Sequence, residues 1–233
     1  MKSTSDIVNG CIEEFLKDYV NSPLLYLRES SAQSRLRELI HRALDKKTCH
    51  AQVMDANKDD GPAYGRGEVA RTQEEMKVPN EKNSRTDIIV FREATEKNPI
   101  TLSRERNGAL DIIARTKSVD IDAAIEIKAA CSADKSQRAL FVQDLIKLLS
   151  IKDAPPKISR HFVLIDKSVC LGGVDAIKNK DPITEWWNQE PNSTESEIKV
   201  NESAPGNKPF VHVWTIEAPD NNISINHRYC THS

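Results

Sequence analysis

The chain has few of the features by which several large classes of protein are recognised. Its five cysteines are odd in number and scattered, without a CxxC pair, which argues against a zinc ribbon or a disulfide framework and favours a reducing compartment. No apolar run approaches the roughly 20 residues needed to span a bilayer. The N-terminal stretch MKSTSDIVNG lacks the long apolar core of a signal peptide. We therefore expect a cytoplasmic protein without a membrane partner.

The chain also lacks an excess of charge of one sign. Its formal net charge is −2, so a nucleic-acid partner would have to be bound by a local basic patch. There is no GxxxxGK[ST] loop, which excludes an ATPase or helicase of that type, and the six histidines form no HxH or HExxH pattern. The sequence shows no pattern that pairs a nucleophile with a base, so it gives no indication of another class of enzyme.

Helix and strand patterns alternate along the 233 residues. Apolar residues predict an amphipathic N-terminal helix over 5–20, and Pro23 is placed to begin a second helix that runs to about Leu44. Residues 45–65 are polar and predict a loop, and 136–149 predict a helix. Strands are expected within 67–78 and at 86–91, 109–117, 121–128, 161–166 and 209–218, with 109–117 and 121–128 forming a hairpin. This order predicts a single α/β domain over 1–233, with a central mixed β-sheet flanked by helices.

The stretch DAAIEIKAA at 122–130 carries two charges in an otherwise apolar strand. Side chains alternate along a strand, so Glu126 and Lys128 share one face, about 7 Å apart, while Ile125 and Ile127 share the other. Such charges are costly to bury unless they are paired or bind a metal. The pattern therefore indicates a strand end that faces a cleft.

A second apolar strand, RTDIIV at 85–90, also carries one acidic residue. We expect Asp87 on this strand to lie beside Glu126. Two carboxylates suit Mg²⁺, which keeps several waters and takes few protein ligands. A lysine next to the metal can orient or deprotonate an attacking water. The combination predicts a site for phosphodiester hydrolysis.

Asp87, followed by Glu126-Ile-Lys128 between apolar residues, resembles the motif of the PD-(D/E)xK nuclease superfamily, which includes many restriction endonucleases. The resemblance implies a restriction-endonuclease-like core over about 22–166, with 167–233 as a C-terminal extension. It implies that Asp87, Glu126 and the backbone carbonyl of Ile127 bind the metal and that Lys128 positions or activates the attacking water. Mg²⁺ would be the cofactor, with Mn²⁺ as a substitute, and DNA would be the substrate. A role in restriction, phage defence or DNA repair follows only by analogy of fold.

The sequence departs from the family's pattern in two ways. Thr86, rather than proline, precedes Asp87, and Asp87 lies 39 positions before Glu126, a long separation for this family. Either an insertion lies at 93–108, or the metal aspartate is Asp111, which lies 15 positions before Glu126. Asp87 is preferred because its surroundings are closer to those of the family.

Several other polar residues are candidates for supporting roles. Glu29 and Gln33 lie at the start of the face of the second helix that is expected to pack on the sheet. Members of the family often have a glutamate on this helix that reaches the metal, and Glu29 is the matching residue. The alternative for Glu29 is a solvated residue at a frayed helix start, with Glu38 as a second choice. Gln143, on the later helix, either touches the site or is simply solvated. The candidates for contact with nucleic acid are Arg85, Lys135 and Arg138.

Two readings of function remain open. The first is a metal-dependent nuclease; because cleavage of both strands calls for two active sites, a homodimer is one expectation. The second is a catalytically inactive, nuclease-like module that binds nucleic acid or protein. The intact Glu126 and Lys128 favour the first reading, and binding of a divalent metal would separate the two.

Overall fold

Two α-helices begin the chain, and sequence patterns account for both. The computed structural model describes residues 2–26, 28–55, 65–77, 85–107, 110–117, 120–130, 140–141, 143–144, 147–148, 151, 158–166, 199–201, 209–217 and 224–231. Helix α1 (Thr4–Asn21) starts from a capping box in which the Ser3 hydroxyl accepts a hydrogen bond from the Asp6 N–H and the Asp6 carboxylate accepts one from the Ser3 N–H. Its apolar stripe is buried, as the sequence predicts.

The second predicted helix is divided. Pro23–Tyr26 form a short 3₁₀ turn, η1, and helix α2 runs over Glu29–Ala43. The turn places Tyr26 against Phe15 of α1, with ring centroids 5.5 Å apart in an edge-on arrangement. This packing gives a physical reason for the break, and it makes Glu29 the first residue of α2.

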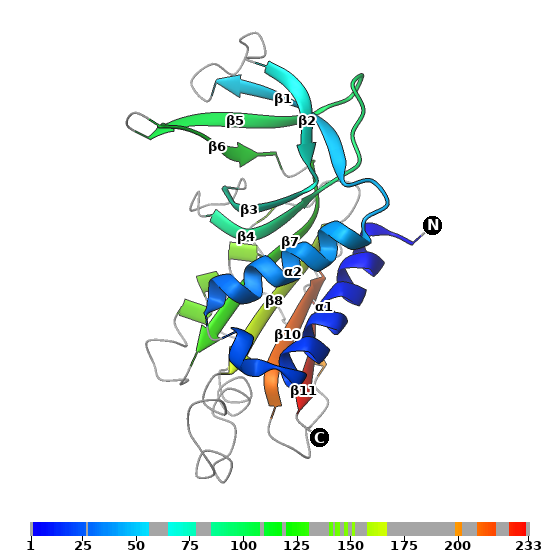
Figure 1. Ribbon diagram of the computed structural model, residues 1–233, viewed down its shortest axis with the longest axis vertical. Coiled ribbons are helices and arrows are strands. Elements are labelled where there is room, and N and C mark those ends of the chain that lie inside the picture. Colours follow the sequence, from blue (N-terminus) through cyan, green and yellow to red (C-terminus); the bar gives the residue numbers. More distant parts are fainter. Residues whose placement is uncertain are drawn as a thin grey trace.

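The strands lie in one large mixed sheet (Figure 1). In chain order they are β1 (Thr48–Asp55), β2 (Gly65–Ala70), β3 (Thr72–Lys77), β4 (Arg85–Phe91), β5 (Ile100–Asn107), β6 (Leu110–Thr116), β7 (Ile121–Ala130), β8 (Ser159–Asp166), β9 (Lys199–Asn201), β10 (Pro209–Glu217) and β11 (Ser224–Thr231). Their order across the sheet is β2-β1-β5-β6-β3-β4-β7-β8-β10-β11-β9. The pairs β1–β5, β3–β6, β7–β8 and β9–β11 are parallel and the other pairs antiparallel. The expected α/β fold with a mixed sheet flanked by helices is confirmed.

Three expectations about strands were wrong. Residues 48–55, expected within a loop, form β1, and the region 67–78 holds most of two strands rather than one. The expected hairpin of 109–117 with 121–128 does not form, because β6 pairs with β5 and β3 while β7 pairs with β4 and β8. The reason is burial: Ala123, Ala124, Ile125 and Ile127 of β7 are all completely buried, and such a strand requires covered neighbours on both edges.

The β5–β6 hairpin accounts for the long separation between Asp87 and Glu126. Between β4 and β7 the chain forms these two strands, which pair antiparallel with each other and lie toward the β1 side of the sheet. The insertion expected at 93–108 thus contains β5 and is followed by β6. Beyond β8, the described parts of 167–233 contribute β10, β11 and β9, which continue the same sheet.

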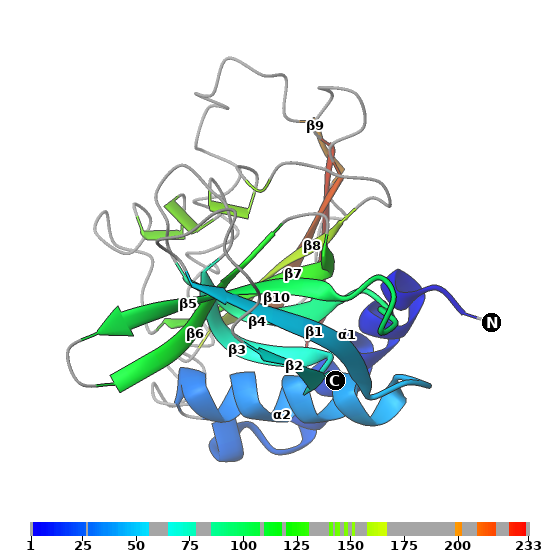
Figure 2. The ribbon, with the colours of Figure 1, turned by 90° about the horizontal axis from the view of Figure 1, so that it is seen from above.

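The sheet is covered on both faces (Figure 2). Helices α1 and α2 pack on one face, where their apolar stripes meet Ile125 and Ile127 of β7. On the other face the segment 140–148, whose described residues are helical as predicted, packs through Phe141 and Leu148. Ala124 of β7 belongs to this second cluster. Residues at even positions of β7, Glu126 among them, therefore face the 140–148 helix.

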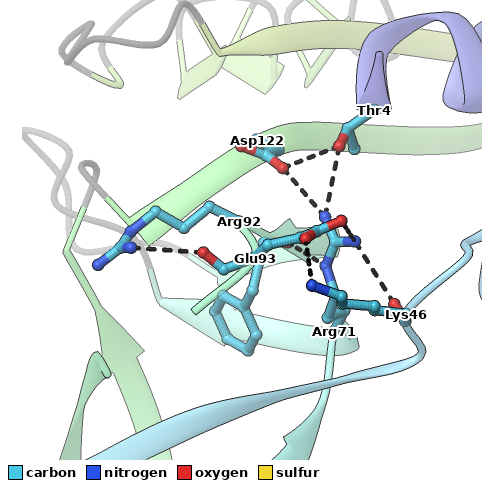
Figure 3. Close-up of polar contacts among 7 residues, drawn as sticks. Thr4, Lys46, Arg71, Arg92, Glu93 and Asp122 are labelled. Atoms are coloured by element: carbon cyan, nitrogen blue, oxygen red, sulfur yellow. Dashed lines mark hydrogen bonds and ion pairs between the residues drawn. The ribbon is translucent and has the colours of Figure 1, made fainter. Parts of the chain in front are cut away.

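A buried arginine fixes the start of β7 (Figure 3). The guanidinium of Arg71, 1% exposed, lies 3.1 Å from Asp122 of β7 and 3.3 Å from the Thr4 hydroxyl. Its Nε donates to the carbonyl of Phe91 at 2.9 Å. Thr4 in turn donates to Asp122 at 2.9 Å. The cluster joins α1, β4 and β7 at one end, so the other end of β7 is held in a defined position.

Candidate active site

The end of β7 lies beside the start of β4 near the middle of the sheet (Figure 1). Their antiparallel ladder ends at the pair Ile88 and Ile125, which leaves Asp87 and Glu126 opposite each other one position further out. Beyond this point the Asp87 side chain takes the place of the ladder, because its Oδ2 accepts the Ile127 N–H at 2.7 Å. The structure thus brings together the two carboxylates that the sequence singles out.

Glu126 is completely buried, with 0% of its surface exposed. The ammonium of Lys147 lies 2.6 Å from Oε2 as an ion pair. Among the described residues neither carboxylate oxygen of Glu126 has a hydrogen-bond partner of good geometry. Burial raises the pKa of Glu126 well above its usual value, and the charge of Asp87 raises it further, while Lys147 acts in the opposite direction. Glu126 therefore holds its proton more tightly than an ordinary glutamate, and further positive charge at this point would favour its ionised form.

Asp87 is also buried, with 8% of its surface exposed. Burial raises its pKa to about 6, although the hydrogen bond from Ile127 and the charges of Lys128 and Lys147 lower it in part. Gln33 of α2 supports the strand at this point, since its Nε2 donates to the Asp87 carbonyl at 2.8 Å. Gln33, expected at the sheet-facing side of its helix, is buried there and positions the backbone that carries the aspartate.

Lys128 lies among three acidic residues. Its Nζ is 3.2 Å from Glu29 Oε1 and 3.7 Å from Asp144 Oδ2. Burial alone would lower the pKa of Lys128, but the charges of Asp144, Glu29 and Asp87 outweigh it and raise the pKa. Lys128 is therefore an ammonium at neutral pH, which suits it to orient an anion or a water rather than to remove a proton.

Glu29 lies at the first turn of α2, where the helix dipole favours a negative charge. Besides pairing with Lys128, its Oε2 accepts the Ala129 N–H at 3.3 Å. Its side chain is 38% exposed, so this contact is made at the surface end of β7. Of the two alternatives raised by the sequence, the structure shows Glu29 in contact with the motif lysine.

Two site residues were missed from the sequence: Asp144 and Lys147. Both lie on the 140–148 helix, and Lys147 Nζ contacts Asp144 Oδ1 at 3.4 Å. Lys147 also donates to the Arg85 carbonyl at 2.7 Å. The spacing of Phe141, Asp144 and Leu148 gave a signal, because positions i, i+3 and i+7 share one helix face and the two apolar residues are buried. A charged residue on that buried face predicts a partner on the sheet.

The other candidates lie in different places. Asp111 lies on β6, which is separated from β7 by β3 and β4, whereas Asp87 lies on the adjacent strand. Gln143 is exposed. Arg85 is the exposed first residue of β4. Lys135 and Arg138 lie outside the described residues.

Asp87, Glu126 and the Ile127 carbonyl are the groups that would hold a metal. An extended residue directs its N–H and C=O to the same edge, so the Ile127 carbonyl faces the side on which its N–H meets Asp87. The buried Glu126 Oε1, which lacks a hydrogen bond from any described residue, fits a cation ligand. No group of three or more His, Cys, Asp or Glu side chains in the described part of the chain is placed to hold a metal ion. Two carboxylates suit Mg²⁺, which retains much of its water.

Comparison with known proteins gives little further information. No family model and no curated protein matches the chain. Among solved structures, NucC of P. aeruginosa ATCC27853 in its cAAA-bound form has 14% identity and a TM-score of 0.27, over 65% of this chain and 51% of that chain. NucC of E. coli MS115-1, also cAAA-bound, has 12% identity and a TM-score of 0.26, over 65% and 50%. The matches span about half of each NucC chain, and TM-scores this low do not establish a shared fold. No helix in the described ranges is long and apolar enough to cross a membrane.

Proposed function

We propose that this protein is a metal-dependent nuclease that hydrolyses phosphodiester bonds in DNA. The observation that carries the proposal is the buried Glu126 opposite Asp87, with Lys128 on the same strand. Two neighbouring carboxylates with raised pKa values are unfavourable unless a cation joins them. A divalent cation bound there would polarise the phosphate and lower the pKa of a bound water.

The chain's own residues supply the remaining parts of such a site. Asp87 and Glu126 provide the oxygen ligands, and Gln33 keeps the Asp87 backbone in place. The Lys128 ammonium is fixed by Glu29 and supplies positive charge for a phosphate oxygen or orients the attacking water. DNA as the substrate, Mg²⁺ or Mn²⁺ as the metal and a role in restriction, phage defence or repair all come from the motif's resemblance to PD-(D/E)xK nucleases. A homodimer would supply the two sites that double-strand cleavage needs.

The second candidate function is a nuclease-like module that binds without cutting. The ion pairs of Glu126 with Lys147 and of Lys128 with Glu29 favour it, because they satisfy both motif residues without a metal. A module of this kind would bind nucleic acid or protein and would show no dependence on divalent cations.

The decisive experiment is cleavage of linear, circular and single-stranded DNA with Mg²⁺ or Mn²⁺, alongside Lys128→Ala. We expect cleavage that requires the metal and falls by about 100-fold or more in the variant. Lys17→Ala, an exposed lysine of α1, is the matched control and should cleave like the wild type. If the wild type cuts no DNA, or if Lys128→Ala cuts as fast as the wild type, the proposed DNA nuclease is wrong. Cleavage of RNA instead would retain the chemistry and change the substrate.

A further inference from the structure

Asp144 of the 140–148 helix lies between two lysines of the candidate active site. One of its carboxylate oxygens, Oδ1, is 3.4 Å from Nζ of Lys147, and the other, Oδ2, is 3.7 Å from Nζ of Lys128. The two ammonium groups are thus held next to each other, although one belongs to a helix and the other to β7. The side chain of Lys147 is only 11% exposed, so it is not a solvated lysine of the surface.

The two lysines differ in their other contacts. Lys128 also pairs with Glu29, at 3.2 Å, and Glu29 is not among the groups that would hold the metal. Lys147, in contrast, lies 2.6 Å from Oε2 of Glu126. The cation next to the buried carboxylate is therefore Lys147 rather than the lysine of the sequence motif.

The contacts of Lys147 already use all of its hydrogen-bond donors. An ammonium has three N–H donors, and those of Lys147 face oxygens of Glu126, of Asp144 and of the Arg85 backbone. A divalent cation on Glu126 would repel an ammonium so close to the same carboxylate, because like charges interact strongly where little water screens them. The contact with Glu126 is thus the one that Lys147 would give up when a metal binds.

We propose that Lys147 is a second phosphate-binding lysine, which exchanges Glu126 for an oxygen of the DNA phosphate when a divalent cation occupies the two carboxylates. The inference rests on the proposed nuclease function and adds a residue that binds its substrate. A phosphate, like a carboxylate, presents more than one oxygen on a single atom, so two adjacent ammonium groups can bind it together. Asp144 is then a positioning residue that keeps Lys147 beside Lys128.

The test is the salt dependence of DNA binding by Lys147→Met, measured by fluorescence anisotropy with a labelled duplex, once in EDTA and once at a constant concentration of Ca²⁺. Ca²⁺ prefers oxygen ligands, as Mg²⁺ does, and a gel of the recovered DNA shows whether the duplex stays intact. With Ca²⁺ we expect the plot of log K against log salt to be less steep in the variant than in the wild type by about 0.9, for the loss of one phosphate contact. In EDTA the two slopes should be equal, because Lys147 then remains with Glu126.

Lys17→Met, at an exposed position of α1, is the matched control and should give the wild-type slope under both conditions. Lys147→Arg keeps the charge and should restore most of the slope that depends on Ca²⁺. If Lys147→Met does not fold, Lys147→Gln replaces it with the same expected slopes, because its amide can still donate to Glu126 but carries no charge. A purely structural role of Lys147 would change the slopes in EDTA and in Ca²⁺ alike, and that result would overturn the inference.

The rate of cleavage gives a second readout. At a saturating concentration of Mn²⁺, Lys147→Met should cleave DNA about 100-fold more slowly than the wild type, because one positive charge on the phosphate is lost. Equal rates at saturating Mn²⁺ would mean that Lys147 only occupies the position of the metal, and would overturn its role with the phosphate.

The outcomes separate the inference from the function it rests on. Metal-dependent cleavage by the wild type, with equal slopes for wild type and Lys147→Met in Ca²⁺, would overturn the role of Lys147 and retain the nuclease. A difference in slope that is confined to Ca²⁺, without cleavage of any DNA by the wild type, would retain Lys147 as a phosphate-binding residue and overturn the nuclease. Wild-type protein that binds no DNA under either condition would overturn the inference.

Discussion

At the scale of single residues, the site is a set of buried charges balanced by one another. Lys147 contacts Oε2 of Glu126, beside the Oε1 that would bind a cation, and Asp144 contacts the Lys128 ammonium that would otherwise face a phosphate. The 140–148 helix therefore provides one charge of each sign where metal and substrate are expected. Removal of either charge should change how the site binds its ligands.

Replacement of Lys147 by methionine tests this balance. The variant keeps an apolar side chain of similar length but removes the ammonium that lies 2.6 Å from Glu126. We expect Mn²⁺ alone, without DNA, to bind about tenfold more tightly, which corresponds to about 1.4 kcal/mol for displacement of the ion pair. We also expect the metal-free variant to be less stable, because a buried carboxylate is left without a partner. Calorimetric titration and urea unfolding measure the two effects.

Lys17→Met, on an exposed face of α1, serves as the control for loss of a lysine. Metal binding that is weaker in Lys147→Met than in the wild type would mean that Lys147 supports the metal site rather than competes with the cation.

At the scale of the elements, the position of the 140–148 helix depends on an arginine of β8. Arg160, 2% exposed, donates to the carbonyls of Leu148 at 3.0 Å, Ile158 at 3.2 Å and Ile151 at 2.6 Å. Carbonyls at a helix C-terminus lack partners within the helix, and a cation there also meets the negative end of the dipole. Arg160 thus links the site helix to the strand next to β7.

Arg160→Met should therefore affect both stability and the site. Loss of the charged donors removes three buried hydrogen bonds, at an expected cost of about 3 kcal/mol in the free energy of unfolding. Hydrogen exchange in 140–151 should accelerate more than exchange in α1, because the helix loses its attachment to β8. Arg42→Met, at an exposed position, should change neither quantity. Equal protection of 140–151 in Arg160→Met and the wild type would show that the helix is held by its apolar face alone.

Elements with a strong local pattern could be predicted from the sequence. The stripe of α1, the apolar runs of β4 and β8, and the alternation of charged and apolar residues in β7 all depend on neighbours in the chain. The same alternation identified Glu126 and Lys128 as residues of one face. Asp87 could be proposed as a partner because its strand has a single buried acidic position.

The remaining features depend on contacts between distant parts of the chain. The polar composition of 48–55 conceals β1, which is stabilised by pairing with β2 and β5 rather than by an apolar pattern of its own. Because β4 and β7 pair with each other, the β5–β6 hairpin between them in the chain lies elsewhere in the sheet. The pattern of β5 and β6 alone does not indicate that position. Asp144 and Lys147 could be placed on a helix face from the sequence, but the strand that this face covers could not.

At the scale of the whole molecule, burial of ionisable groups makes stability depend on pH and on metal. The pKa of Asp87 is about 6 in the folded protein, against 3.8 for an ordinary aspartate. The folded state therefore holds this proton more tightly than the unfolded chain. The contribution of Asp87 to the free energy of unfolding is largest at low pH and declines as the pH rises through about 6.

Comparison of the wild type with Asp87→Asn isolates this contribution. In the absence of metal we expect the stability of the variant to increase relative to the wild type between about pH 4 and about pH 7, with most of the change below about pH 6. Millimolar Mg²⁺ should raise the unfolding midpoint of the wild type more at the upper end of this range, where protons no longer compete, and should raise it little in Asp87→Asn or Glu126→Gln. Thermal unfolding at several pH values measures both effects. Parallel curves for wild type and Asp87→Asn would contradict the raised pKa.

The pairing between β3 and β6 has a mechanical consequence. Among the described residues a single rung, Lys77 with Arg115, joins the strands β2-β1-β5-β6 to the rest of the sheet. Contacts outside the ladders join the same two parts: the Arg71 N–H donates to the Lys47 carbonyl at 2.9 Å, the Arg71 carbonyl accepts the Phe91 N–H at 2.7 Å, and the Thr101 N–H donates to the Asp120 carboxylate at 2.8 Å. The connection between β2 and β3, with Arg71 at its centre, therefore provides an attachment that the strand pairing alone does not.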